Sequence, residues 1–223
     1  MIVFDLDGTL IDSSRDLADA VSELVQAYGG PALTESDVVH MIGDGASVLV
    51  ARALLHGGLD PKTPGALECF LRIYDRRLLD HTVAYEGMHE VLALLTERGP
   101  LAVLTNKPLA PTEEVLRHLG LRGFFSHIMA GDGPHPRKPD PTALRVLMAS
   151  AASPPVMIGD SPVDAQTAAA AGCRFILASY GFGVAKFGGR LPDGIRRARH
   201  PRELVSLAET RTFDAARDPI VIR

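Results

Sequence analysis

Short apolar runs alternate with helix-forming stretches along most of this chain, and this alternation restricts the possible folds more than any other feature. The apolar runs have the length of buried strands, and the stretches between them repeat apolar residues at helical spacing. Strands separated by helices indicate a parallel sheet that is covered on both faces. The expected fold class is therefore α/β with a doubly wound parallel sheet. The expected strands are residues 2–6, 101–105, 127–130, 156–160 and 174–178.

A helical block interrupts the alternation after the first strand. Residues from about 14 to 81 contain helix-forming stretches and no convincing strand. Ser13 and Ser14 are suited to begin the first helix, because a hydroxyl side chain can cap a helix N-terminus. We expect this block to be an insert between the first strand and the rest of the sheet. Later helices are expected at residues 88–95, 111–119, 141–148 and 163–171.

The chain after Gly181 is weakly patterned. The basic run at residues 196–199 is expected to be a loop with a solvated face, and residues 201–207 a last helix. Residues 209–223 are expected to form a frayed terminus.

Composition excludes several classes of protein. The 223 residues are 46% hydrophobic and 22% charged, which is typical of one large globular domain or of a domain with a smaller insert. The net charge of −4 gives no basic surface for nucleic acid. No apolar stretch reaches the ~18 residues that a membrane-spanning helix needs, and the first residues do not resemble a secretory signal. We therefore expect a cytoplasmic protein with neither nucleic acid nor membrane as a partner.

The two cysteines, Cys69 and Cys173, lie far apart in the sequence. We expect both to be free thiols in a reducing compartment rather than a disulfide. The chain has no Cys-x-x-Cys pair, so a zinc knuckle is not supported.

Polar side chains follow four of the expected strands, at the point where each strand ends. In a doubly wound sheet, ligands bind at this edge. Each feature alone has a simpler explanation, as a turn or a helix cap, but all of them together in this order indicate a single site. Two carboxylates held two residues apart also favour a divalent cation, because like charges repel unless a positive charge lies beside them. The residues are Asp5, Asp7, Thr105, Asn106, Lys138, Asp160 and Asp164.

These motifs resemble those of the phosphatase branch of the haloacid dehalogenase superfamily. The resemblance covers the chain up to about residue 180. It implies a Rossmann-like catalytic core with a helical cap domain over the active site, formed by residues 14–81. Residues 1–13 and 82–223 would form the core. The four matching motifs are Asp5-Leu6-Asp7-Gly8-Thr9, Leu104-Thr105-Asn106, Lys138 within Arg-Lys-Pro-Asp-Pro, and Gly159-Asp160-Ser161-Pro162-Val163-Asp164.

The resemblance implies a role for each motif. Asp5 would be the nucleophile that forms an aspartyl-phosphate, and Asp7 the general acid and base. Thr105 and Lys138 would stabilise the charge on the transferred phosphoryl group. Mg²⁺ would be held by Asp5, by the backbone carbonyl of Asp7 and by Asp160. Asp164 would hold metal-bound water or orient Lys138.

Residues 41–54 are similar to the cap segment of phosphoglycolate phosphatases. Glycines there allow close approach of the backbone, and the start of the following helix favours an anion. A small substrate carboxylate is therefore expected near Gly43, Gly45 and Ala46, with Asn106 also in the substrate site. Arg52 is either a partner for that carboxylate or part of an ordinary salt bridge. Lys107, directly after the Thr-Asn motif, faces either phosphate or solvent.

The expected activity is Mg²⁺-dependent hydrolysis of a small phosphate monoester, with 2-phosphoglycolate as the first candidate. A pyrophosphatase, a sugar-phosphate phosphatase, a phosphomutase and a non-catalytic binding protein remain alternatives. Asp7 argues against a dehalogenase, because halide leaves without a proton. Lys62 is the only lysine between Asp12 and Asp80 and lies near a turn, which argues against Schiff-base chemistry. The chain is expected to be a monomer or a homodimer.

Overall fold

The centre of the molecule is a parallel β-sheet. The computed structural model describes residues 1–149, 151, 155–188, 191 and 195–209. Within these residues the sheet has six strands in the order β5-β4-β1-β6-β7-β8, and every neighbouring pair is parallel. The α/β class predicted from the sequence is confirmed. The strands are β1 (Ile2–Phe4), β4 (Leu101–Leu104), β5 (Phe125–Met129), β6 (Val156–Gly159), β7 (Arg174–Ala178) and β8 (Arg196–Ala198).

The inner strands β1, β4, β6 and β7 are buried along nearly their whole length, as expected for parallel strands with both faces covered. Successive side chains of a strand point to opposite faces. Val3 accordingly belongs to the hydrophobic cluster that includes Leu144 of helix α7 (Thr142–Ala149), whereas Phe4 belongs to the cluster that includes Leu92 of helix α5 (Met88–Thr96).

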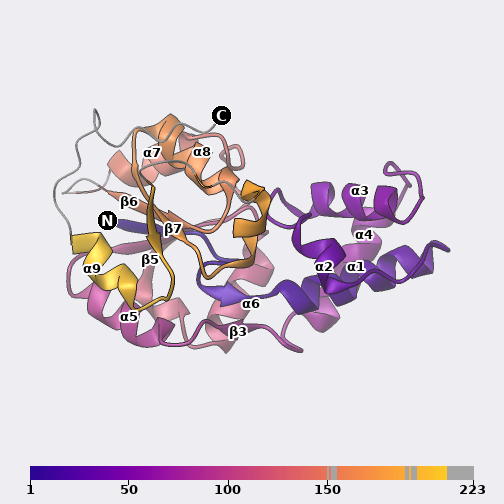
Figure 1. Cartoon of the computed structure of the whole chain (residues 1–223), viewed down its shortest axis with the longest axis horizontal. Coiled ribbons are helices and arrows are strands. Elements are labelled where there is room, and N and C mark those ends of the chain that lie inside the picture. The colour runs from indigo at the N-terminus through magenta and orange to yellow at the C-terminus, as the bar shows by residue number, and fades with distance from the viewer. Residues whose placement is uncertain (150, 152–154, 189–190, 192–194, 210–223) are drawn as a thin grey trace.

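Helices cover the two faces of the sheet (Figure 1). Helices α7 and α8 lie on one side, and α5 and α9 lie on the other. Two short 3₁₀ helices, η1 and η2, complete this part of the chain. The bounds are α5 (Met88–Thr96), α6 (Leu109–His118), η1 (Arg122–Phe124), α7 (Thr142–Ala149), α8 (Pro162–Ala171), η2 (Phe182–Phe187) and α9 (Glu203–Glu209).

Four further helices form a block at one end of the sheet (Figure 1). They are α1 (Ser14–Ala27), α2 (Glu35–Val39), α3 (Ala46–His56) and α4 (Ala66–Arg77), and we call them the helical block. Apolar side chains at helical spacing on α1, among them Val21 and Leu24, are fully buried and belong to the same cluster as Phe70 of α4. The predicted helical character of residues 14–81 is confirmed.

A small antiparallel ribbon joins the helical block to the sheet, and the sequence analysis did not predict it. It pairs β2 (Ile11–Asp12) with β3 (Val83–Ala84). The two strands are too short for any periodicity to be visible in the sequence. The ribbon brings together the two points at which the chain enters and leaves the helical block.

The carboxylate of Asp16 ties these two crossing points together. It is buried at the start of α1 and accepts hydrogen bonds from the backbone N–H groups of His81 and Thr82, at 3.0 and 2.8 Å. The Thr82 hydroxyl also donates to it, at 2.7 Å. Burial alone would raise the pKa of Asp16, but the hydrogen bonds from His81 and Thr82 outweigh burial and hold the pKa below its usual range.

Three predictions near the ends of elements need correction or comment. The first strand stops at Phe4 rather than residue 6, because the Leu6 carbonyl turns to accept hydrogen bonds from Thr9, Leu10 and Ile11. The basic run was expected to be a loop, but Arg196–Ala198 forms the edge strand β8, with Ala198 fully buried. The last helix is present as α9, and residues 210–223 of the expected frayed terminus lie outside the described residues.

Two smaller predictions can also be compared with the structure. Cys69 and Cys173 are both free thiols, as predicted. Among the described residues, none of the helices combines the length and the apolar character that crossing a bilayer requires.

Replacing Asp16 tests the importance of this connection. We expect Asp16→Asn to lower the free energy of unfolding by about 2–3 kcal/mol at pH 7, because a buried amide cannot accept all of these hydrogen bonds. The folded-state pKa is lowered, so the stabilisation by Asp16 is complete above about pH 4 and is lost as the pH falls through the folded-state pKa. Urea unfolding of both proteins between neutral and acidic pH measures this difference.

Asp19→Asn is the matched control. Asp19 lies on the same helix, is 46% exposed in its side chain and lies 4.0 Å from Arg15. Its replacement should change the unfolding free energy by less than about 0.5 kcal/mol. An Asp16→Asn protein as stable as this control would show that the connection contributes nothing to folding.

Candidate active site

The predicted motifs meet at the carboxyl edge of the sheet. Asp5 follows the central strand β1, Thr105 follows β4 and Asp160 follows β6, and all three side chains are buried. Adjacent parallel strands end side by side, so their following residues converge. The Asp5 N–H donates to Ile158 of β6 at 2.8 Å, and the Thr105 N–H donates to Met129 of β5 at 2.9 Å. The sheet therefore fixes the backbone of two of these motifs directly.

Lys138 lies between two carboxylates. Its Nζ is 2.7 Å from Oδ1 of Asp5 and 2.7 Å from Oδ1 of Asp164. Burial alone would lower the pKa of Lys138, but the charges of Asp164 and Asp5 outweigh burial and raise the pKa. The side chain is therefore a buried, permanently charged ammonium group at the base of the site.

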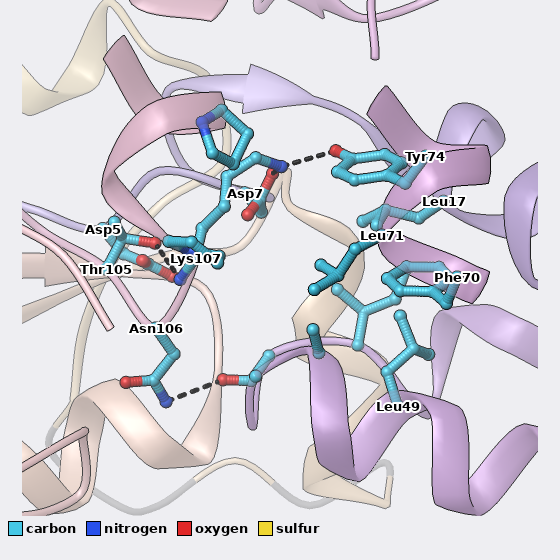
Figure 2. A pocket seen from close by; sticks show the side chains of 16 residues that line it. Asp5, Asp7, Leu17, Leu49, Phe70, Leu71, Tyr74, Thr105, Asn106 and Lys107 are labelled. Carbon is cyan, nitrogen blue, oxygen red and sulfur yellow. Dashed lines mark hydrogen bonds and ion pairs between the residues drawn. The ribbon is translucent and has the colours of Figure 1, made fainter. Parts of the chain in front are cut away.

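Asn106 holds the Lys138 backbone from both sides. Its Oδ1 accepts a hydrogen bond from the Lys138 N–H at 2.9 Å, and its Nδ2 donates to the Lys138 carbonyl at 3.0 Å. Nδ2 also donates to the carbonyl of Gly43 at 3.0 Å (Figure 2). Asn106 was predicted to bind substrate, and the structure shows all three of these bonds going to the protein backbone.

Asp164 caps helix α8 and also faces Lys138. Its Oδ2 accepts hydrogen bonds from the N–H and the hydroxyl of Ser161, at 3.1 and 2.6 Å, and so caps helix α8. Its Oδ1 faces Lys138. The capping bonds orient the carboxylate, and the oriented carboxylate positions the lysine.

Asp160 is enclosed by glycines. The Gly183 N–H donates to its Oδ2 at 2.6 Å. Gly8 has φ +86°, and a Cβ at this position would lie 1.9 Å from the same oxygen. Any side chain at residue 8 would therefore both strain the backbone and collide with the carboxylate. The sequence analysis identified Asp160 but not the contribution of Gly183, which lies in the weakly patterned region.

Three carboxylates form a cluster that fits a divalent cation. Asp5, Asp160 and Asp164 each offer an oxygen, and these atoms all lie within 4.8 Å of one another. Burial, followed by the charge of Asp164, raises the pKa of Asp5 to about 7 although Lys138 opposes the shift. Burial, followed by the charges of Asp164 and Asp5, raises the pKa of Asp160. Carboxylate oxygens are ligands that Mg²⁺ prefers. The three carboxylates also carry more negative charge than the single Lys138 can offset.

Asp7 lies outside this cluster and has its own lysine. The Ser13 hydroxyl donates to its Oδ1 at 2.6 Å, and Lys107 Nζ lies 3.1 Å from the same oxygen. Ser13 occupies the N-cap position of α1, as predicted, but its hydroxyl makes no capping bond there. The expectation that Asp7 ligates Mg²⁺ through its carbonyl stays a prediction.

The ammonium group of Lys107 lies neither in solvent nor beside the ion pairs of Lys138 with Asp5 and Asp164. It is buried, and its ammonium group donates to the Tyr74 hydroxyl as well as to Asp7 (Figure 2). Burial would lower the pKa of Lys107, but the charge of Asp7 outweighs burial and raises the pKa. The sequence analysis did not identify Tyr74, which comes from the helical block.

A cavity separates these polar residues from the helical block. Asp5, Asp7, Thr105, Asn106 and Lys107 line it on the sheet side. Apolar side chains of the block face them across the cavity (Figure 2). The predicted substrate residues Gly43, Gly45 and Ala46 also line it. The apolar wall consists of Leu17, Ile42, Leu49, Phe70 and Leu71, with Pro108 and Pro111 from the sheet side.

Arg52 is not among the residues that line this cavity. Its guanidinium group pairs with Asp44 and donates to the carbonyl of Met41 at 3.0 Å. Of the two interpretations that the sequence left open for Arg52, the structure therefore shows the salt bridge.

The same segment of the block is attached to the sheet side by a second lysine. Lys186 of η2 donates to the carbonyl of Ile42, and its Nζ is 3.4 Å from Asp44. Together with the Asn106 bond to Gly43, this contact holds the cavity-lining turn against the site.

Comparison with known proteins gives consistent results. The sequence profile of the family described as haloacid dehalogenase-like hydrolase matches residues 2–178. A protein named phosphoglycolate phosphatase from Pseudomonas savastanoi pv. phaseolicola is 40% identical over 191 residues, which are 82% of this chain and 70% of that protein. A protein of the same name from Rhodospirillum rubrum is 39% identical over 192 residues, 81% of this chain and 80% of its own length.

Solved structures share the fold. A crystal structure described as a predicted phosphoglycolate phosphatase from Haemophilus somnus superposes with a TM-score of 0.82 at 26% identity, covering 94% of this chain and 97% of that one. CbbY from Rhodobacter sphaeroides, crystallised in complex with phosphate, superposes with a TM-score of 0.73 at 26% identity, covering 91% of this chain and 95% of that one. The sequence match, the shared fold and the clustered acidic motifs lead to one conclusion: this chain belongs to the haloacid dehalogenase-like hydrolase family.

Proposed function

We propose that this chain is a Mg²⁺-dependent phosphatase that hydrolyses 2-phosphoglycolate through an aspartyl-phosphate intermediate. The observation that carries the proposal is the position of Asp5 on the cavity wall, where it pairs with Lys138 and belongs to the acidic cluster. The names of the relatives from Pseudomonas savastanoi and Rhodospirillum rubrum support the choice of substrate.

In this mechanism Asp5 is the nucleophile. Lys138 engages Oδ1 of Asp5, so we assign the attack on phosphorus to Oδ2. A bond forms between this oxygen and phosphorus as the ester P–O bond breaks, and the bonding electrons leave with the ester oxygen. Lys138 and the Thr105 hydroxyl offset negative charge on the phosphoryl oxygens. When Mg²⁺ is bound by Asp5, Asp160 and the Asp7 carbonyl, it offsets the repulsion between Asp5 and the phosphate.

Asp7 is the general acid and the general base in this mechanism. Ser13 and Lys107 both engage its Oδ1, which leaves Oδ2 for proton exchange. In the first step Asp7 protonates the leaving oxygen. In the second step it takes a proton from the water that attacks the phosphorus of the aspartyl-phosphate, and the Asp5 carboxylate is released.

We further propose that residues 14–81 act as a cap domain over a core of residues 1–13 and 82–223. The apolar wall contributed by the helical block would exclude bulk water from the reacting groups. The bonds from Asn106 and Lys186 to the turn at residues 42–44 would hold the block over the cavity. A cavity enclosed in this way suits a small phosphate ester.

Replacement of Asp5 tests the nucleophile. We expect Asp5→Asn to reduce p-nitrophenyl phosphate turnover on the order of 10³-fold or more, because an amide cannot form the acyl-phosphate. Acid quenching after brief incubation with radiolabelled substrate should leave label on the wild-type chain and none on the variant. A chelator should abolish wild-type turnover, and added Mg²⁺ should restore it.

Asp140→Asn is the control for this experiment. Asp140 lies two residues beyond Lys138. Its Oδ1 accepts a hydrogen bond at 2.8 Å from the N–H of Thr142, the first residue of α7. This variant should keep its turnover. Full activity in Asp5→Asn would remove Asp5 as the nucleophile, and chelator-resistant turnover would remove the metal from the proposal.

Replacement of Asp7 separates the two chemical steps. We expect Asp7→Asn to lower turnover of 2-phosphoglycolate by about 10²–10⁴-fold, the usual contribution of acid–base catalysis. With p-nitrophenyl phosphate the leaving group needs no proton, so labelled phosphoenzyme should accumulate because only its hydrolysis is impaired. Mg²⁺ affinity measured by calorimetry should be retained, and loss of that affinity would contradict ligation through the backbone carbonyl.

A panel of substrates tests specificity. We expect kcat/KM for 2-phosphoglycolate to exceed that for hexose phosphates and pyrophosphate by more than about 10-fold, because the cavity is small and has an apolar wall. Initial rates of phosphate release with Mg²⁺ measure this preference. Equal efficiency across the panel would favour a general phosphatase, and a preference for pyrophosphate or a sugar phosphate would replace the proposed substrate.

A further inference from the structure

We infer that Lys107 is a specificity-determining residue that binds a carboxylate on the leaving group of the substrate. This inference rests on the proposed function and deepens it. It predicts a class of substrate: phosphate esters whose alcohol carries a carboxylate close to the ester oxygen.

Lys107 lies next to Asp7, the proposed general acid. A general acid must lie within hydrogen-bond reach of the oxygen that it protonates. The leaving oxygen of any substrate is therefore next to Asp7, and Lys107 Nζ is only 3.1 Å from Asp7 Oδ1. A group attached near the leaving oxygen must then lie close to the Lys107 ammonium group.

The ionisable residues around the cavity also support this role for Lys107. Among the described residues that line it, Lys107 is the only lysine, arginine or histidine. The other ionisable groups on the sheet side are the carboxyl groups of Asp5 and Asp7, and the opposite wall is apolar apart from Tyr74. A triply charged carboxylate phosphate would be repelled by this set of groups unless a cation met its second anionic group. Lys138 is not among the residues that line this cavity, and in the proposed mechanism it serves the phosphoryl group.

Lys107 also retains the capacity to bind a further anion. An ammonium group has three donors, and the acceptors recorded within the described residues are Asp7 and Tyr74. A substrate carboxylate can take the remaining donor of this buried ammonium group.

Tyr74 fixes the ammonium group against the wall of the helical block. Its hydroxyl accepts from Lys107, and Lys107 Nζ lies 4.6 Å from the centre of its ring. The ring is itself stacked on Phe70, at 5.6 Å between centroids. Burial raises the pKa of Tyr74 to about 12, so the phenol remains neutral and does not neutralise the lysine. The charge of Lys107 thus remains available to the cavity.

The cation that we infer for the carboxylate consequently differs from Arg52, which the sequence left open as a partner. Arg52 is committed to Asp44 and Met41 and does not line the cavity. The cavity-lining turn at Gly43 and Gly45 remains compatible with a carboxylate held by Lys107, because it lines the same cavity.

The first test measures binding without turnover. 3-Phosphonopropionate is a non-hydrolysable analogue of 2-phosphoglycolate, and 3-hydroxypropylphosphonate replaces its carboxylate with a neutral group. Calorimetry with Mg²⁺ present should show that the wild-type chain binds the carboxylate analogue about 10- to 100-fold more tightly, the usual size of a hydrogen bond between charged groups. Equal affinities in the wild type would overturn the inference without any variant.

The second test replaces the lysine. Lys107→Met keeps a stem of similar size and removes the charge, whereas Lys107→Arg keeps the charge. We expect the methionine variant to lose about 10- to 100-fold of the binding preference, and the arginine variant to keep most of it. The exposed Lys62 of the helical block provides the control variant Lys62→Met, which should behave as wild type.

Kinetics distinguish this role from simple support of Asp7. Loss of Lys107 should reduce kcat/KM for 2-phosphoglycolate about 10- to 100-fold more than that for 2-hydroxyethyl phosphate, which lacks the carboxylate. An equal loss for both esters would overturn the inference, because it would mean that Lys107 serves only Asp7.

The binding and kinetic experiments distinguish failure of the proposed phosphatase activity from failure of the inferred carboxylate site. If the wild type hydrolysed neither ester and yet the Lys107-dependent preference in binding persisted, the proposed reaction would be wrong and the binding site would stand. If both esters were hydrolysed and the preference did not depend on Lys107, the binding site would be wrong and the phosphatase would stand.

Discussion

The ion pairs of Lys138 with Asp5 and Asp164 are the constraint on which the rest of the structure depends. Each of these side chains is buried, and taking such charges out of water is costly unless they are paired with good geometry. Both distances of 2.7 Å meet this requirement. An arrangement of this kind is weak evidence for stability, because apolar side chains could fill the same space. Its position at the end of the central strand β1 therefore suggests retention for chemistry rather than for folding.

Hydrogen bonds of Asn106 connect the backbone of Lys138 to the residues that line the cavity. Asn106 holds the backbone of Lys138 on both sides, and its third bond goes to Gly43 in the helical block. The residue that holds the backbone of Lys138 thus also positions the turn that lines the cavity. A polar network of this kind is fully satisfied only when the block is docked. The position of the block and the geometry of the buried lysine are consequently coupled.

The sequence was sufficient for strands β1, β4, β5, β6 and β7 and for the convergence of the motifs, but not for strand β8 or for contacts across the cavity. Strands β1, β4 and β6 are apolar along their length, so their runs of apolar residues predicted them. Strand β8 was missed because Arg196 and Arg197 are charged and only Ala198 is buried at this edge. Tyr74 was missed because it is 33 residues from Lys107, and their contact depends on how the block docks. No local pattern records such docking.

Two carboxylates only two residues apart thus have separate partners. Asp5 pairs with Lys138 at the base of the sheet, whereas Asp7 pairs with Lys107 beside the block. The partners of Asp5 all come from the sheet and its loops. The Asp7 pair is completed by Ser13 at the entrance to the block and, through Lys107, by Tyr74 on α4. Displacement of the block would remove the Tyr74 contact of Lys107 directly, and it would reach Lys138 through the bond from Asn106 to Gly43. The helical block thus acts directly on the Asp7 pair and indirectly on the Asp5 pair.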